Sequence, residues 1–194
     1  MSELNSLLSS GNFDMNDVAR RLDAMSDAER VEETRSWGRR AQANLFEAAK
    51  GHRKLGIDQL VPGKGPLEEV PHQGRNTLPA FTRFAKVFCR PDNSANELWG
   101  YNRSGSVVGT FVGPGYYVAY DDGDEVLIDY TRLPLGKPGN WPPILQNDER
   151  LSRFVYNGMA DALRGVSEHV SIGRAIRNGK VMDSWFVLCR SELN

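Results

Sequence analysis

The dipeptide Asn178-Gly179 constrains the fold of this chain more than any other short feature. Asn-Gly supplies the two residues with positive φ that a type I′ turn requires, and this turn joins neighbouring antiparallel strands. Counting outward from the turn places Arg174 opposite Asp183. The end of the chain is therefore predicted to be a β-hairpin, which excludes an all-helical fold.

The two faces of this hairpin differ in the size of their side chains. One face carries small residues on its first strand, namely Ser171, Gly173 and Ala175, opposite large residues on the second strand. A strip of small residues can border a cavity or receive a packed helix. We expect the helix, because an apolar stripe elsewhere in the chain needs a surface to bury it.

The stretch from Glu97 to Leu133 is rich in β-branched and aromatic residues separated by short glycine-containing turns. Asp122-Gly123 fits the centre of a type I′ turn, which places Asp121 opposite Asp124. Pro114-Gly115 fits the centre of a type II turn. Short turns between strands predict antiparallel pairing.

Residues 14–50 show helical periodicity. Asp14 is a suitable N-cap for a first helix, and Ser26 with Glu29 has the spacing of a capping box for a second. The second helix carries an apolar stripe that includes Trp37 and Leu45. We predict a helical hairpin here, preceded by a frayed segment of residues 1–12.

Three further segments give weaker signals. The many prolines and glycines of residues 51–80 predict an irregular connection, and residues 80–90 suit a helix or a strand equally well. Residues 148–166 place apolar side chains at helical spacing, which predicts a third helix.

Together these signals predict an α+β fold: an N-terminal helical hairpin followed by a mostly antiparallel, curved β-sheet with a helix packed on it. We expect residues 1–55 to form the helical segment and residues 56–194 the sheet with its helix, the two making one compact unit.

Composition narrows the class of protein. The 194 residues carry 24 basic and 25 acidic side chains, and this balance makes nucleic-acid binding unlikely. No segment has the features of a signal peptide or the length of a membrane-spanning helix. Cys89 and Cys189 do not form a disulfide framework and are expected to be free and buried, so we predict a cytoplasmic protein without membrane contact.

No spacing typical of a metal or nucleotide site is present. The histidines, His52, His72 and His169, stand far apart and have no partner in a metal-binding pattern. His72 is expected in a polar loop. The sequence therefore predicts no metal and no cofactor.

Six polar or aromatic residues of the β-rich part are the candidates for ligand binding. Tyrosine offers apolar area and a hydroxyl, Asp129 interrupts an apolar strand, and arginines suit an anionic ligand. Asp129 and His169 are also the candidate catalytic acid–base pair. The candidates for ligand binding are Tyr101, Tyr116, Asp129, Arg132, His169 and Arg174.

Three classes of function remain open on the sequence. The first, which we expect, is a non-catalytic module that binds a small ligand or a protein. The second is an enzyme that uses Asp129 and His169 on a small anionic substrate. The third is a nucleic-acid-binding protein that uses the basic segments 35–54 and 72–90. A homodimer through the N-terminal helices is possible if the stripe with Trp37 and Leu45 is not covered by the sheet.

Overall fold

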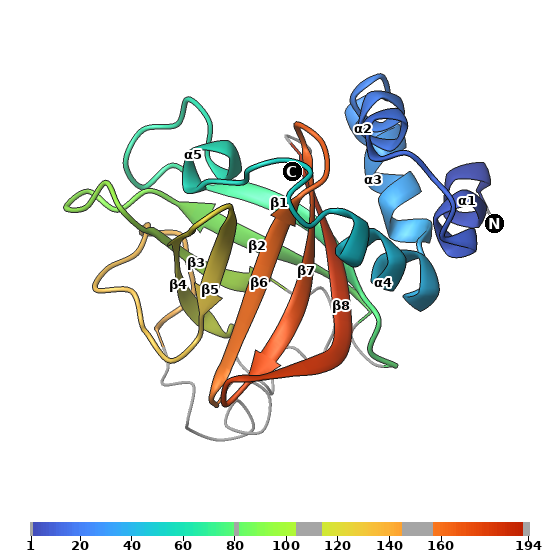
Figure 1. Cartoon of the computed structure of the whole chain (residues 1–194). Helices are drawn as coiled ribbons and strands as arrows, with labels where there is room; N and C mark the ends of the chain where they lie inside the picture. Colours follow the sequence, from blue (N-terminus) through green and yellow to red (C-terminus); the bar gives the residue numbers. More distant parts are fainter. Residues whose placement is uncertain (1, 80–81, 104–113, 145–156, 192–194) are drawn as a thin grey trace.

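The computed structural model describes residues 2–79, 82–103, 114–144 and 157–191, which form a closed antiparallel barrel flanked by helices (Figure 1). Each strand pairs with the next along the chain, and the last pairs with the first. The strands are β1 (Val70–Asn76), β2 (Arg83–Cys89), β3 (Leu98–Arg103), β4 (Tyr116–Asp122), β5 (Glu125–Asp129), β6 (Met159–Gly165), β7 (Val170–Arg177) and β8 (Lys180–Arg190).

The predicted α+β class and antiparallel pairing are confirmed, whereas the open curved sheet is wrong. The sheet closes because β1 pairs with β2 on one side and with β8 on the other, for example Gly74 with Phe84 and with Leu188. The segment that contains β1 was predicted to be irregular. Its backbone groups pair with the next strand, β2, on one side and with the distant β8 on the other, and this pairing outweighs its Pro and Gly content.

The third predicted helix is also wrong. Met159–Gly165 forms β6, and its burial alternates from residue to residue as in a strand with one face inside a barrel. Residues 148–156 lie outside the described part of the chain. Alanine, leucine and methionine favour helices, but β6 lies between β5 and β7, so pairing on both sides overrides this preference.

Five helices are present among the described residues. They are α1 (Glu3–Ser10), α2 (Met15–Asp23), α3 (Asp27–Ser36), α4 (Arg39–Ala48) and α5 (Ile57–Leu60). The predicted N-cap at Asp14 and the capping box of Ser26 and Glu29 are confirmed. The segment predicted to fray instead forms α1, and the long second helix is interrupted at Trp37 and Gly38, both of which are extended.

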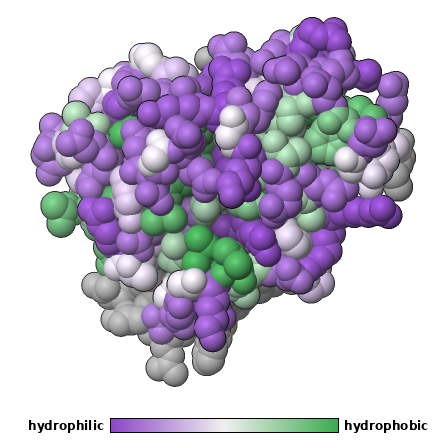
Figure 2. Space-filling model, viewed as in Figure 1, coloured by the Kyte–Doolittle hydropathy of each residue, from purple (hydrophilic) through white to green (hydrophobic). Residues whose placement is uncertain are grey.

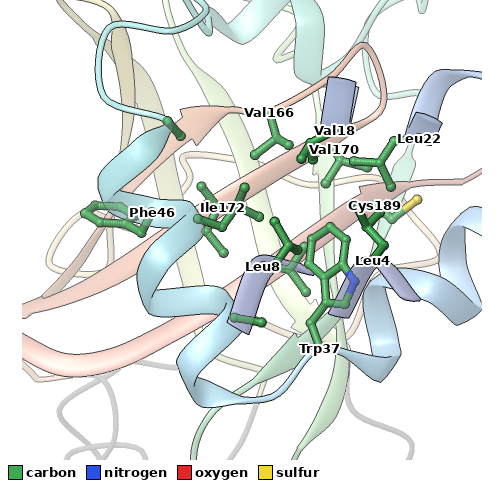
Figure 3. Packing of buried hydrophobic residues seen from close by; sticks show 14 of the residues in the cluster. Leu4, Leu8, Val18, Leu22, Trp37, Phe46, Val166, Val170, Ile172 and Cys189 are labelled. Carbon is green, nitrogen blue, oxygen red and sulfur yellow. The ribbon is translucent and has the colours of Figure 1, made fainter. Parts of the chain in front are cut away.

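The helices α1 to α4 cover the outer wall of the barrel at β7 and β8 (Figure 1). Figure 3 shows Leu8, Trp37 and Val18 from the helices packed with Val170 and Ile172 from β7. Trp37 and Leu45 are both 0% exposed. The stripe expected to serve a homodimer is thus covered within the chain.

This packing reverses the expected use of the two hairpin faces. The bulky face, with Ile172 and Val187, contacts the helices, whereas Gly173 faces the barrel interior opposite Phe186. The strip of small residues therefore borders the interior of the barrel and not a helix.

Both predicted hairpins are present, but their registers differ from the prediction. Asn178 and Gly179 have positive φ, as a type I′ turn requires, and a bulge then moves Arg174 opposite Trp185. In the other hairpin Asp122 pairs with Glu125, so Gly123 and Asp124 make the turn. Only Gly123 has positive φ there, the position at which a type II′ turn takes glycine.

None of the helices in the described ranges is long and apolar enough to cross a membrane. The predicted type II turn at Pro114-Gly115 is only partly described, because its first residue, Gly113, lies outside these ranges; Gly115 has a φ of 54°.

Candidate functional site

Aromatic rings fill the middle of the barrel by lying over glycines of neighbouring strands. An added Cβ would lie 2.3 Å from the Tyr117 ring at Gly100 and 2.2 Å from the Phe186 ring at Gly173. Real Cβ atoms do not approach other atoms so closely, so only glycine fits opposite these rings. Three such glycine–aromatic pairs face each other directly across two strands: Gly74 with Phe84, Gly100 with Tyr117, and Gly173 with Phe186.

Four polar side chains meet among these rings, and we call them the interior polar cluster: Lys86, Asn102, Tyr130 and Asp161. Lys86 Nζ lies 3.1 Å from Asp161 Oδ2 and donates to Asn102 Oδ1 at 3.1 Å. The Tyr130 hydroxyl contacts Lys86 Nζ and lies 3.2 Å from Asp161 Oδ2. The cluster joins β2, β3, β6 and the residue that follows β5.

The ion pair of the interior polar cluster is almost completely removed from water. The side chains of Lys86 and Asp161 are only 2% and 6% exposed. Burial lowers the pKa of Lys86, while the charge and hydrogen bond of Asp161 act in the opposite direction. The rings of Tyr117 and Phe186 lie 4.9 Å and 5.1 Å from Nζ and add cation–π attraction.

Exposure increases toward one end of the barrel. Asn102, a member of the interior polar cluster, is half-buried, and so are Phe84 and Met159, which pack against the apolar residues of the interior. Asp161 and the residue opposite it, Ala175, remain buried. Among the described residues, the half-buried side chains of the interior thus lie toward this end, which we call the polar end.

A second polar side chain of the interior connects the barrel to α5. His72 of β1 is the direct partner of Lys86 on β2, and its Nε2 donates to the Leu60 carbonyl oxygen at 2.9 Å. Burial lowers the pKa of His72 to about 4, so the imidazole is neutral at physiological pH. The prediction of a loop position for His72 is wrong, because reading its neighbours as loop residues overlooked β1.

The candidates Tyr101 and Tyr116 lie together, but on the outer wall. They face each other across β3 and β4 with ring centroids 5.7 Å apart. Trp141 packs on Tyr101 at 4.8 Å, and the Tyr116 hydroxyl donates to the Pro142 carbonyl oxygen. Both tyrosines are buried beneath the segment 131–144.

Asp129 and His169 lie near opposite ends of the barrel. Asp129 pairs with Ala160, which pairs with Ile176, and the distance from Ile176 back to His169 is roughly 20 Å along the strand. The Asp129 carboxylate accepts hydrogen bonds from the backbone and hydroxyl of Thr131. It therefore stabilises a turn, and the two residues do not converge.

The remaining candidates have partners on the outer surface. His169 Nδ1 accepts a hydrogen bond from Arg190 at 3.0 Å, and burial followed by nearby arginine charges lowers its pKa. Arg132 forms an ion pair with Glu97 at 2.9 Å.

Arg174 stacks on Trp185 and contacts the expected Asp183 at 3.7 Å. None of these contacts includes a member of the interior polar cluster, so the six candidates do not form one site with it.

Both cysteines are buried and free, as expected, and burial raises the pKa of each thiol to about 12. Neither is therefore a reactive nucleophile at neutral pH.

The sequence reasoning missed Lys86 and Asp161. Lys86 alternates with Phe84 and Phe88, so a strand reading of this segment would have placed a lysine on its apolar face. Asp161 gave no signal, because the segment was read as a helix. Their meeting depends on pairing through the three intervening strands, β3, β4 and β5.

Comparison of the chain with protein-family models finds no match, and comparison with curated proteins finds none either. We therefore infer a function from the geometry alone.

Proposed function

We propose that this chain is a non-catalytic small-molecule-binding barrel, and that its ligand enters at the polar end. One observation carries the proposal: a buried ion pair, Lys86 with Asp161, stands inside the barrel with Tyr130 and Asn102 next to half-buried side chains. Sites for small molecules combine mostly apolar walls with a few convergent polar groups, as this region does.

The cost of the ion pair supports a role beyond stability. Two charges lose their hydration when they are buried, and replacing such a pair by apolar residues of similar size is often neutral or stabilising. The aromatic rings that fill the middle of the barrel would pack equally well if no charged pair lay among them. The interior of an eight-stranded barrel is wide enough either to be filled by side chains or to hold one small ligand.

The interior polar cluster also indicates the chemistry of the ligand. Lys86 and Asp161 carry opposite charges, so the pair has no net charge and does not favour an anion. Asn102 offers an amide donor and acceptor where exposure begins, and Phe84 and Met159 offer apolar contact. We therefore propose a small, uncharged ligand with one polar group and an apolar body.

A protein partner is less well supported than a small molecule. Hydrophilic residues dominate the face seen in Figure 2, with hydrophobic ones gathered in small areas over the barrel and the N-terminal helices. Among the described residues the large apolar side chains that are exposed are Leu78, Leu135 and Val181. They lie in separate segments, whereas interaction surfaces present contiguous apolar patches.

The acid–base alternative loses its geometric basis, because Asp129 and His169 lie near opposite ends of the barrel.

For the cellular location of the protein we propose the cytoplasm. Its support is that both cysteines are free.

Native mass spectrometry of the freshly purified protein tests the proposal. We expect a mass excess over the denatured chain, corresponding to a co-purified small molecule. The double variant Lys86→Met with Asp161→Leu removes both charges together, so the barrel should stay folded while the mass excess disappears. Lys86→Met alone leaves a buried unpaired carboxylate and should destabilise the chain by about 3–5 kcal/mol.

The ion pair of Arg132 and Glu97 on the outer wall provides a matched control. Its double variant, Arg132→Gln with Glu97→Gln, should keep the bound molecule. If the wild-type chain is free of ligand, saturable binding of the uncharged fluorescent probe N-phenyl-1-naphthylamine is measured for the same variants. Absence of both signals, or a bound molecule unaffected by loss of Lys86 and Asp161, would contradict the proposal.

A further inference from the structure

Three arginines from two distant segments meet on the outer wall of the barrel, and we call them the arginine cluster: Arg35, Arg75 and Arg83. Arg75 and Arg83 are direct partners across β1 and β2. Arg35, near the end of α3, donates through Nη2 to Gln73 Oε1 at 2.7 Å, and Gln73 lies on the same face of β1 as Arg75. The two basic segments noted in the sequence therefore meet at this point.

No carboxylate of the described residues neutralises the arginine cluster. Within residues 2–79, 82–103, 114–144 and 157–191, no carboxylate lies within ion-pair distance of any of the three guanidinium groups. Like charges placed directly opposite each other on paired strands are unfavourable. Burial, followed by the charge of Arg83, lowers the pKa of Arg35, and the charge of Glu32 acts in the opposite direction.

Local contacts hold part of the arginine cluster in place. Arg75 Nη1 donates to the backbone oxygen of Arg35, which ties β1 to the end of α3. The Nε atom of Arg35 is buried and has no hydrogen-bond partner among the described residues. Arg83 is exposed, and Arg35, Arg75 and Gln73 are half-buried. Arg35 and Arg75 are thus held in place by these contacts, and Arg83, the strand partner of Arg75, is exposed at the surface.

We propose that the arginine cluster binds a compact tetrahedral oxyanion, such as the phosphate of a phosphate monoester. Guanidinium groups match phosphate oxygens with paired N–H donors, and a doubly charged anion relieves the repulsion between Arg75 and Arg83. Gln73 supplies a neutral amide that orients Arg35. Arg75 and Arg83 are direct strand partners and Arg35 is tied to the same strand, so the three arginines suit a single anionic group.

The surroundings favour a compact anion over a nucleic-acid strand. Three other cations of the two basic segments are engaged elsewhere: Lys86 lies inside the barrel, Arg90 pairs with Asp58, and Arg39 contacts Asp183. Strand binding needs a continuous basic groove with aromatic rings for stacking. The arginine cluster is a local group of charges and not a continuous basic groove.

Thermal unfolding of the full chain with added anions tests this inference. Sodium phosphate and phenyl phosphate, each compared with sodium chloride at equal ionic strength, should raise the midpoint in a saturable way. Saturation by both probes indicates a site for the phosphate group itself, and saturation by phenyl phosphate alone indicates a site for monoesters. Arg83→Gln should weaken the binding roughly tenfold or more, because it removes charged hydrogen bonds.

Arg103→Gln is the matched control, since Arg103 also lies on the outer wall but contacts Glu69 at 3.6 Å. This variant should bind phosphate as the wild type does. Because Arg83 is exposed and faces Arg75, Arg83→Gln should be at least as stable as the wild type without phosphate.

Equal responses to phosphate in Arg83→Gln and the wild type would overturn the inference, as would a response no larger than that to chloride. If a short oligothymidylate bound more tightly than phosphate, and its affinity grew with its length, the ligand would be a nucleic-acid strand and not a compact anion. The inference is independent of the proposed interior site. If Arg83→Gln loses phosphate binding but keeps the interior ligand, the phosphate site and the interior site are independent of each other.

Discussion

At the scale of single residues, His72 shows how burial selects a protonation state. Its Nε2–H is used by the Leu60 carbonyl oxygen, and its Nδ1 is buried without a partner among the described residues. Phe88 packs against the ring at 5.0 Å, so a charge here would have little solvation. The neutral imidazole therefore links α5 to the barrel, and protonation would disturb this link.

We predict that the free energy of unfolding falls as the pH is lowered through the titration of His72. The pKa of His72 is about 4 in the folded chain and 6.5 in the unfolded chain. Between these values the unfolded chain binds a proton that the folded chain does not, so stability decreases by up to about 3 kcal/mol as the pH falls. Urea unfolding across this range measures the change.

The variant His72→Gln is the control for this prediction, because its amide retains a donor for the Leu60 carbonyl oxygen but does not titrate. It should lose this part of the pH dependence, while the part due to His169 remains. Identical slopes for the variant and the wild type would show that His72 is not responsible.

At the scale of elements, neighbouring strands fit together where an aromatic ring on one strand packs over a glycine on the next. The Tyr117 ring covers Gly100, is 0% exposed, and its hydroxyl donates to the Val87 carbonyl oxygen at 3.2 Å. The ring is thus fixed at both ends and cannot move aside. This arrangement makes glycine necessary in a strand where its flexibility would otherwise be unfavourable.

We predict that Gly100→Ala destabilises the chain by about 1–3 kcal/mol, the usual cost of an extra methyl group in a well-packed core. Alanine has the better backbone propensity, so a loss of stability must come from the contact with Tyr117. Chemical denaturation measures it. Gly139→Ala is the control, because a Cβ there meets nothing within 4 Å. Similar effects at the two positions would refute the packing argument.

At the scale of the whole molecule, one apolar cluster joins the N-terminal helices to the barrel. Trp37 lies in this cluster with Leu4 and Leu8 of α1, and with Ile172 and Val187 of the barrel wall (Figure 3). The Trp37 indole nitrogen donates to Glu33 at 2.9 Å, so its polar atom is satisfied. Removing this side chain should loosen the helices before it loosens the distant strands.

We predict that Trp37→Ala lowers the free energy of unfolding by about 3–5 kcal/mol, as expected for a large buried side chain. Hydrogen exchange should accelerate in α1 to α4 more than in β3 to β6. Trp141→Ala removes an equally large side chain from the opposite wall and should leave exchange in the helices unchanged. Equal acceleration in helices and distant strands after Trp37→Ala would show that no separate helical unit exists.

The predictions that the sequence supported best depend on neighbours along the chain. The caps at Asp14 and Ser26 and the turn at Asn178-Gly179 involve contacts within a few residues, and all are present. The pattern of alternating faces in the hairpins was also correct. The exact pairing was not, because a bulge and the choice of turn type depend on how the strands fit their other neighbours.

The candidate site was not predictable in the same way. Lys86 and Asp161 come from segments that were read as ambiguous and as helical, and their contact requires all the pairings from β2 to β6. The six candidate residues were chosen for their chemistry, and most of them face outward. Which face of a strand lies inside depends on barrel closure, which no local pattern specifies.

The sequence by itself thus determined the helix caps, the hairpin at the end of the chain, the antiparallel pairing and the mixed α+β class, since these follow from local backbone preferences. Only the tertiary structure decided that β1 pairs with β8, that Met159–Gly165 is a strand, and that Lys86 and Asp161 share the interior. The physical reason is that closure brings together groups far apart in sequence, and the energy of that packing overrides local preference.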